Sequence, residues 1–183
     1  MTREEFEHVI RVAAALVRDE IVVVGSQAVL AEFPNAPDSL LRSQELDVYP
    51  RSNPELAGEI DAVMGDGSQF HAVTGYYAHG VGPETVQGPA GWEGRLKRLD
   101  LPAIRKRDGT AVAWCLEVHD LVLAKLAAGR EHDLVFSKDA IHEGLVDVEN
   151  LRRGVELMPE DVRSLVEERL EGLVSQLARE GAN

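Results

Sequence analysis

The sequence predicts an α+β fold, with a mixed sheet flanked by helices and a C-terminal helical segment. Two observations support this prediction. Over the first 118 residues, short apolar runs typical of strands alternate with helical patterns and with glycine- and proline-rich turns. The rest of the chain has helical periodicity. We therefore expect an α/β core over residues 1–118 and a helical segment over residues 119–183 that completes its cleft.

The beginning of the core has clear signals for the ends of its elements. Thr2, with Glu5 three residues later, forms a capping box at the start of an amphipathic helix. Pro50 ends a predicted strand, and Pro54 suits the first turn of a helix. After the first helix, the expected elements are strands at 21–24 and 44–49 and helices at 27–33 and 54–64.

Glycine and proline interrupt the pattern in the middle of the chain, where we expect short strands at 70–74 and 76–78. A hairpin follows, in which Asp108-Gly109 supplies the positive φ that a tight turn requires. Its strands are expected at 103–107 and 110–117. The predicted helices of the last segment are 119–128, 131–142, 147–156 and 160–179.

The most informative local pattern is a pair of carboxylates, Glu45 and Asp47, on the predicted strand 44–49. Side chains two apart on a strand leave the same face, roughly 6.5–7 Å apart at the backbone. Both can therefore bind one divalent cation or a pair of cations. The same alternation also occurs on half-exposed strands whose acids meet only water. Because acids are poor strand formers, the pair favours a metal site.

Gly25 and Ser26 end the first predicted strand and begin the short helix behind it. The N–H groups at a helix start can bind phosphate oxygens. A glycine there is often only a tight turn, and the serine can also cap the helix. Together with the acid pair, this turn indicates a nucleotide and a metal ion.

A hydrophobic strand, a Gly-Ser turn and an acid-apolar-acid-apolar strand together resemble the nucleotidyltransferase superfamily of the DNA polymerase β type. The segment 119–134 is similar to the Lys-Leu-x-Ala-x-Arg-x-x-Asp segment of its AbiEii/MenT-like, toxin-related branch. Trp92-Glu93-Gly94-Arg95-Leu96 resembles a Gly-Trp-Glu-x-Arg-Leu stretch of the same branch. Two features depart from the family pattern: an insertion within residues 27–44, and Glu45 in place of the commoner Asp.

The resemblance implies a nucleotidyltransferase-like mixed sheet and a Mg²⁺-dependent enzyme. Such an enzyme moves an NMP group from an NTP to an acceptor hydroxyl and releases pyrophosphate. Asp47 and Glu45 would hold the metal ions, and Gly25 and Ser26 would hold the triphosphate.

The resemblance also implies that Lys125 and Arg130 bind the triphosphate, and that Asp133 activates the acceptor or ligates a second metal. The residues themselves allow other roles. Arg130 and Asp133 are spaced for a surface ion pair. Lys125 lies in an apolar run, where its ammonium group either reaches solvent or faces a polar cleft.

The acceptor stays open between RNA, a protein hydroxyl and a small molecule such as an aminoglycoside. A net charge of −13, from 32 acidic and 19 basic residues, favours a cationic small molecule or a protein over RNA. The toxin-related branch favours tRNA. The second hypothesis is a non-catalytic, partner-binding member of a toxin–antitoxin-like system, with a cognate antitoxin as partner. The insertion and Glu45 both favour that hypothesis.

A third, different hypothesis comes from the pairs His119-Asp120 and His132-Asp133, which are typical of HD-type metal phosphohydrolases. That fold is nearly all helical, so the predicted strands argue against it. We expect His71 and His79 to be hydrogen-bonded or exposed rather than metal ligands.

The remaining chemical candidates have structural interpretations. Cys115 is expected to be a buried thiol, and Trp92 an anchor in a core. The basic residues form either an exposed, solvated hairpin or a positive rim beside the site; they are Arg95, Lys97, Arg98, Arg105, Lys106 and Arg107. With no apolar stretch of membrane-spanning length and no signal-peptide pattern, we expect a cytoplasmic protein without a membrane partner.

Overall fold

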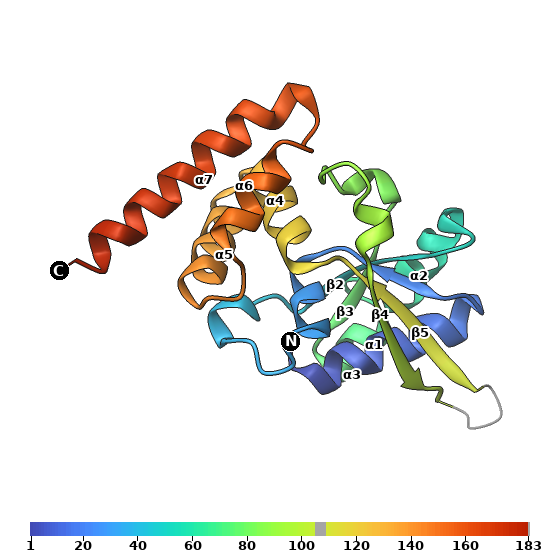
Figure 1. The fold of residues 1–183 in the computed structure, drawn as a ribbon. Coiled ribbons are helices and arrows are strands. Elements are labelled where there is room, and N and C mark those ends of the chain that lie inside the picture. The colour runs from blue at the N-terminus through green and yellow to red at the C-terminus, as the bar shows by residue number, and fades with distance from the viewer. Residues whose placement is uncertain (105–108, 183) are drawn as a thin grey trace. The chain divides into compact units, whose positions relative to one another are not determined.

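A computed structural model describes residues 1–104 and 109–182 (Figure 1). The chain divides into two compact units. The first, called here the sheet unit, comprises Met1–Thr85 and Leu96–Leu116. The second, the helical unit, comprises Val86–Arg95 and Glu117–Asn183. The expected α+β fold, with a mixed sheet, flanking helices and a C-terminal helix, is confirmed.

The sheet unit is built on five strands in the order β3-β2-β1-β5-β4. The pairings β1–β2 and β4–β5 are antiparallel, whereas β1–β5 and β2–β3 are parallel. The strands are β1 (Ile21–Val23), β2 (Glu45–Pro50), β3 (Tyr77–Gly80), β4 (Lys97–Pro102) and β5 (Thr110–Cys115). The mixed pairing places β1, the strand that leads to Gly25, next to the acid-bearing β2.

Helix α1 (Arg3–Val17) begins at the expected capping box, in which Thr2 and Glu5 bond each other's backbone N–H groups. It packs against β2 and β5 through its buried Phe6, Val9, Ile10 and Ala13. On β2, Leu46 and Val48 are fully buried. Because side chains alternate along a strand, Glu45 and Asp47 project from the opposite face.

The shorter helices of the sheet unit differ in detail from the prediction. The helix behind Gly25 is the 3₁₀ helix η1 (Ser26–Ala31), and a further 3₁₀ turn, η2 (Asp38–Leu40), precedes β2. The helix expected at 54–64 starts as a 3₁₀ turn, η3 (Pro54–Leu56), and continues as α2 (Ala57–Met64). Another turn, η4, spans Pro83–Thr85.

One predicted strand is wrong. Residues 70–74 belong to helix α3 (Gln69–Thr74), because Ser68 caps its start and Gly75, with φ 80°, ends it. The described strand that pairs with β5 is β4, residues 97–102; of the hairpin strand expected at 103–107, residues 105–107 lie outside the described residues. The register of this pair places Pro102 opposite Thr110. The expected Asp108 turn position lies outside the described residues.

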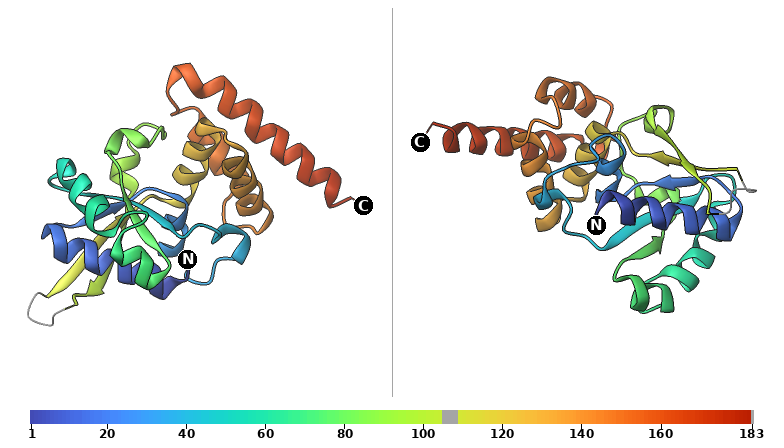
Figure 2. Two further views of the ribbon diagram at one scale, coloured as in Figure 1. Left: turned by 180° about the vertical axis from the view of Figure 1, so that it is seen from behind. Right: turned by 90° about the horizontal axis from the view of Figure 1, so that it is seen from below.

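The helical unit contains α4 (Val118–Ala128), α5 (Glu131–His142), α6 (Val148–Val155) and α7 (Glu160–Glu180), close to the predicted bounds. Figure 2 shows α7 running along the other three helices, all of which it contacts. Gly129, with φ 65°, separates α4 from α5. The Arg169 guanidinium of α7 donates to the carbonyls of Leu126 and Ala127 at the end of α4. These bonds satisfy carbonyls that a helix end leaves unpaired.

The 3₁₀ turn η5 (Trp92–Arg95) also belongs to the helical unit. Trp92 is 7% exposed, which confirms the expected core anchor. Arg95 donates through Nε and Nη2 to the two carboxylate oxygens of Asp120, at 2.8 and 3.1 Å. This paired contact fixes the segment on α4. Within the part of the chain that the structure describes, no helix has the length and apolar character that crossing a membrane requires.

Candidate metal centre

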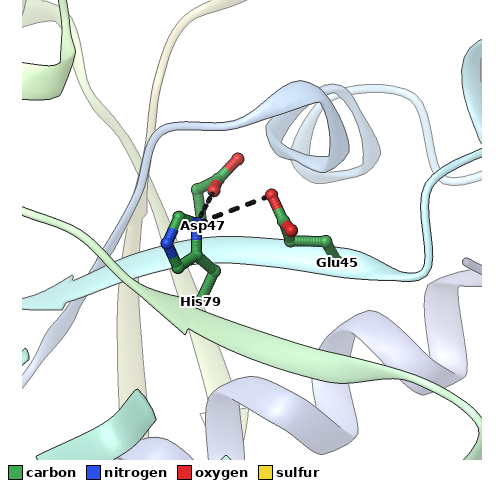
Figure 3. A group of neighbouring side chains, drawn as sticks. All are labelled: Glu45, Asp47 and His79. Carbon is green, nitrogen blue, oxygen red and sulfur yellow. Dashed lines mark hydrogen bonds and ion pairs between the residues drawn. The ribbon is translucent and has the colours of Figure 1, made fainter. Parts of the chain in front are cut away.

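Four polar side chains share one face of the β2–β3 pair. The parallel register places Asp47 opposite His79 and Glu45 opposite Tyr77. Residues two apart on each strand leave the same side of the sheet, so all four side chains meet there. Figure 3 shows Glu45 and Asp47 rising from β2 toward the imidazole of His79 on β3.

The distances make this group a candidate for binding a metal ion. His79 Nδ1 lies 3.0 Å from Asp47 Oδ1 and 3.6 Å from Glu45 Oε1. One potential ligand atom from each of the three residues lies within 4.8 Å of the other two. Tyr77 donates its hydroxyl hydrogen to Glu45 Oε2 at 2.8 Å. Among the described residues, this is the one cluster of three His, Cys, Asp or Glu side chains with such spacing.

Gly25 brings the end of β1 against the acid pair. Its φ of −80° is open to any residue, so its role is not conformational. A Cβ added there would instead collide with the carboxylate of Asp47. The neighbouring Val24 N–H donates to the Asp47 carbonyl at 3.1 Å. The absence of a side chain therefore allows the Gly25 backbone and the Asp47 carboxylate to lie in contact.

Burial and the proximity of a second carboxylate together set the electrostatics of the group. Burial, reinforced by the charge of Glu45, raises the pKa of Asp47 to about 6. Burial disfavours the charged imidazole of His79, but the hydrogen bond to Asp47 and the charge of Glu45 outweigh it and raise its pKa. The bond to Glu45 raises the pKa of Tyr77 to about 12, so the phenol remains a donor. A bound cation would relieve the repulsion between the acids.

The residues present fit a metal ion by their chemistry. Two carboxylates and an imidazole are common metal donors, and Gly25 leaves room for the carboxylate of Asp47. Glu45 and Asp47 were expected as ligands from their spacing. His79 was expected to be only hydrogen-bonded or exposed. The repeated spacing in Tyr77-Ala78-His79 was the available signal, but its use requires knowing that β3 pairs with β2.

Lys125, Arg130 and Asp133 lie together, all within the helical unit. The Asp133 carboxylate is fully buried and accepts from Lys125 Nζ at 2.7 Å and from Arg130 Nε at 2.6 Å. Burial alone would raise the pKa of Asp133, but the bonds from Arg130 and Lys125 lower it. Lys125 Nζ also lies 4.8 Å from the centre of the Phe136 ring. The two cations thus neutralise a buried acid.

Several other candidates have structural partners. Cys115 is fully buried, and burial raises the pKa of its thiol to about 12, which is typical of an inert core cysteine. His71 Nδ1 lies 3.0 Å from Asp66 Oδ1, so this imidazole has a polar partner, as expected. Within the described part of the basic cluster, each member meets an acid; the pairs are Arg95–Asp120, Lys97–Glu32 and Arg98–Asp100. The expected members Arg105, Lys106 and Arg107 lie outside the described residues.

The two His-Asp pairs do not form a metal site of their own in the described part of the chain. His119 Nδ1 contacts Glu117 at 2.7 Å, and Asp120 instead binds Arg95. His132 Nε2 lies 3.6 Å from Asp133, whose oxygens already accept from Lys125 and Arg130. Together with the five-stranded sheet, this pattern argues against the HD-type hypothesis.

Comparison with known protein families adds a match over nearly the whole chain. Residues 4–173 match the family described as nucleotidyltransferase of unknown function (DUF6036). The chain belongs to this family. The expected nucleotidyltransferase superfamily is thereby supported, and the site on β2 and β3 lies within the matched part of this nucleotidyltransferase-family domain. No curated protein and no solved structure among those compared matches the chain.

Proposed function

We propose that the protein is a metal-dependent nucleotidyltransferase that moves an NMP group from an NTP to an acceptor hydroxyl. The supporting observation is the contact between the Gly25 backbone and Asp47, one of two adjacent acids on β2, in a chain of this family. In the proposed reaction the acceptor oxygen forms a bond to the α-phosphorus. The bond to pyrophosphate breaks, pyrophosphate leaves, and the hydroxyl proton passes to water.

Asp47 and Glu45 would hold the metal ion, Mg²⁺ or Mn²⁺, from the open face of β2. When bound, the ion supplies charge neutralisation for the triphosphate and for the transferring phosphoryl group. The protein's own task is to fix two ionised carboxylates side by side. Tyr77 contributes by holding one oxygen of Glu45. The raised pKa of Asp47 means that metal binding competes with a proton there.

Gly25 and Ser26 would hold the triphosphate at the start of η1. A side chain at position 25 would occupy the space that the Asp47 carboxylate fills. With glycine there, backbone N–H groups of the turn and the Ser26 hydroxyl are available beside the proposed metal ligand. Phosphate oxygens are suitable acceptors for such donors.

Lys125 and Arg130 are proposed to attract the negative triphosphate, and Asp133 to act as the further acid. Their contacts within the helical unit support a structural role as well, because both cations bond the buried Asp133. The side chain of Arg130 is 66% exposed, so it also meets solvent. For these three residues the nucleotide role stays a prediction.

The acceptor is proposed only as a class, a hydroxyl on RNA, a protein or a small molecule. Membership of the AbiEii/MenT-like branch rests on the sequence resemblance and stays a prediction, as does a cognate antitoxin. If that membership holds, tRNA is the first acceptor to try. With a net charge of −13, binding of RNA would depend on basic residues gathered in one place.

A label-transfer assay tests the proposal. Purified protein is incubated with each α-labelled NTP and Mg²⁺ or Mn²⁺, with total RNA, a protein extract or an aminoglycoside panel as acceptor. We expect label on one acceptor class, lost in Asp47→Asn and retained in Asp100→Asn. Asp100 is a suitable control because it is an exposed acid on β4 of the same sheet, paired with Arg98. If the wild type neither transfers label nor binds an NTP, the partner-binding hypothesis replaces the enzymatic one.

A further inference from the structure

We propose that His79 is the third ligand of the metal site and makes it prefer a divalent transition ion to Mg²⁺. This inference rests on the metal site of the proposed function, but not on the transfer reaction. It goes beyond the acid pair because His79 lies on a different strand, 32 residues further along the chain.

The three donor atoms are already spaced for one ion. With bonds of about 2.1 Å, neighbouring donors around a metal lie about 3.0 Å apart in octahedral geometry and about 3.4 Å apart in tetrahedral geometry. The Nδ1 atom of His79 lies 3.0 Å from Asp47 Oδ1 and 3.6 Å from Glu45 Oε1. Metal binding would therefore require only small movements of these side chains.

The position of His79 is fixed by the fold rather than by a flexible surface segment. His79 lies directly opposite Asp47 in the parallel register. Backbone hydrogen bonds hold β3 to β2 on both sides of it: the Tyr77 N–H donates to the Gln44 carbonyl, and the Val81 N–H donates to the Val48 carbonyl. Strand β3 also lies so close to α2 that a Cβ on Gly80 would collide with the Ala57 carbonyl. Ligands on such packed elements hold their geometry better than ligands on loops.

Tyr77 orients the second acid toward the same point. Its hydroxyl donates to Oε2 of Glu45, whereas the oxygen nearer to His79 is Oε1. A ligating carboxylate is commonly held in this way by a hydrogen bond to its other oxygen. The arrangement therefore contains three candidate ligands and one residue that positions a ligand.

The donor set determines which ion fits best. Mg²⁺ is a hard cation that prefers carboxylates, water and phosphate oxygens. An imidazole nitrogen favours transition ions, and affinity rises from Mn²⁺ to Co²⁺ along the first row. One nitrogen and two carboxylates should therefore bind Co²⁺ more tightly than Mn²⁺, and Mn²⁺ more tightly than Mg²⁺.

Metal titration and pulsed electron paramagnetic resonance test the inference without any nucleotide. Mn²⁺ bound to the full-length wild type is expected to show ¹⁴N coupling, which shifts to ¹⁵N coupling when histidine is labelled. His79→Ala should abolish the coupling and weaken Mn²⁺ and Co²⁺ binding at least about tenfold, with a smaller effect on Mg²⁺. His142→Ala is the matched control, because His142 is exposed beside Glu143 in the helical unit.

His79→Asp provides a variant that keeps a ligand at the same place. An all-carboxylate set should retain binding and lower the Mn²⁺-to-Mg²⁺ affinity ratio at least about tenfold. A cooperative thermal transition shows that each variant is folded. Absent ¹⁴N coupling in the wild type, or an unchanged affinity ratio in folded His79→Asp, would overturn the inference.

The outcomes for this inference and for the proposed function are separable. Nitrogen coupling without label transfer to any acceptor would support His79 as a ligand and count against the enzymatic proposal. Label transfer with Mg²⁺ and no nitrogen coupling would support the enzyme and leave His79 as a hydrogen-bond partner of Asp47 only.

Discussion

Gly25 and Asp47 are in contact across the β1–β2 pair, and the contact depends on position 25 having no side chain. The carboxylate of Asp47 fills the place of the missing Cβ. The backbone at Gly25 has φ −80°, so alanine would meet no conformational strain there. Position 25 must therefore be glycine for the Asp47 carboxylate to keep its place. This requirement connects the turn after β1 to the proposed metal site.

Gly25→Ala is therefore expected to displace the Asp47 carboxylate and weaken metal binding at least about tenfold, a loss of about 1.4 kcal/mol. Isothermal titration with Mn²⁺ measures this change. Gly58→Ala is the control, because a Cβ at Gly58 in α2 meets nothing within 4 Å. That change should leave metal affinity unaltered and stabilise the fold by about 0.5–1 kcal/mol. Equal metal affinities in the two variants would contradict the proposed importance of the Gly25–Asp47 contact.

The metal-free protein is expected to lose stability as pH rises from about 4 to about 6. Asp47 has its pKa raised to about 6 in the folded state, above its ordinary value of 3.8. Between these values the folded state holds more protons than the unfolded state, so the free energy of unfolding falls with pH. The raised pKa of His79 adds a separate fall above about pH 6.5, where the protonated imidazole that the folded state favours is lost.

Thermal melts across this pH range measure the effect, whose size for Asp47 is at most about 3 kcal/mol. Asp47→Asn should flatten the fall, whereas Asp100→Asn, which changes an exposed acid, should not. Saturating Mn²⁺ should reverse the trend, because the ion binds the ionised carboxylates and its stabilisation grows with pH. A pH dependence identical in wild type and Asp47→Asn would show that another group is responsible.

The parts of the fold that local signals determine could be predicted from the sequence. The capping box at Thr2 and the periodicity of α4 to α7 are of this kind, and those elements appear at nearly the predicted residues. The strand predicted at 70–74 is wrong because Ser68 and Gly75 cap this segment as a helix. The caps, rather than β propensity, determine that six-residue segment.

Of the candidate metal site, only the two acids on β2 could be predicted from the sequence. Glu45 and Asp47 could be found because their spacing is local. Finding His79 requires the parallel pairing of β2 with β3, and periodicity along one strand does not identify its partner. The proposed roles of Lys125 and Asp133 came from resemblance. Their ion pair joins residues on two successive helices, and only the fold shows that the carboxylate is fully buried.

Lys125→Met is expected to destabilise the protein by about 2–4 kcal/mol, since it removes one of two cations bonded to the buried Asp133. Urea unfolding measures this loss. Adding Asp133→Asn to this variant should recover part of the lost stability, because the buried carboxylate that needed both cations is then neutral. Lys138→Met, which breaks an exposed pair with Glu180, should cost under about 1 kcal/mol. Additive losses in the double variant would mean that the two residues do not act as a pair.

Tyr77→Phe is expected to weaken Mn²⁺ binding about tenfold while the protein stays folded. The change removes the hydroxyl that holds Glu45 Oε2, so the carboxylate loses its orientation but remains present. Tyr76→Phe is the matched control, because Tyr76 is the adjacent tyrosine and its hydroxyl instead contacts His8 Nδ1 at 2.8 Å. Both variants lose one hydrogen bond and should lose a similar stability of about 1 kcal/mol. A selective loss of metal affinity in Tyr77→Phe, measured by titration, therefore separates positioning of the ligand from general destabilisation. If both variants lose metal affinity equally, Tyr77 has no specific part in the site.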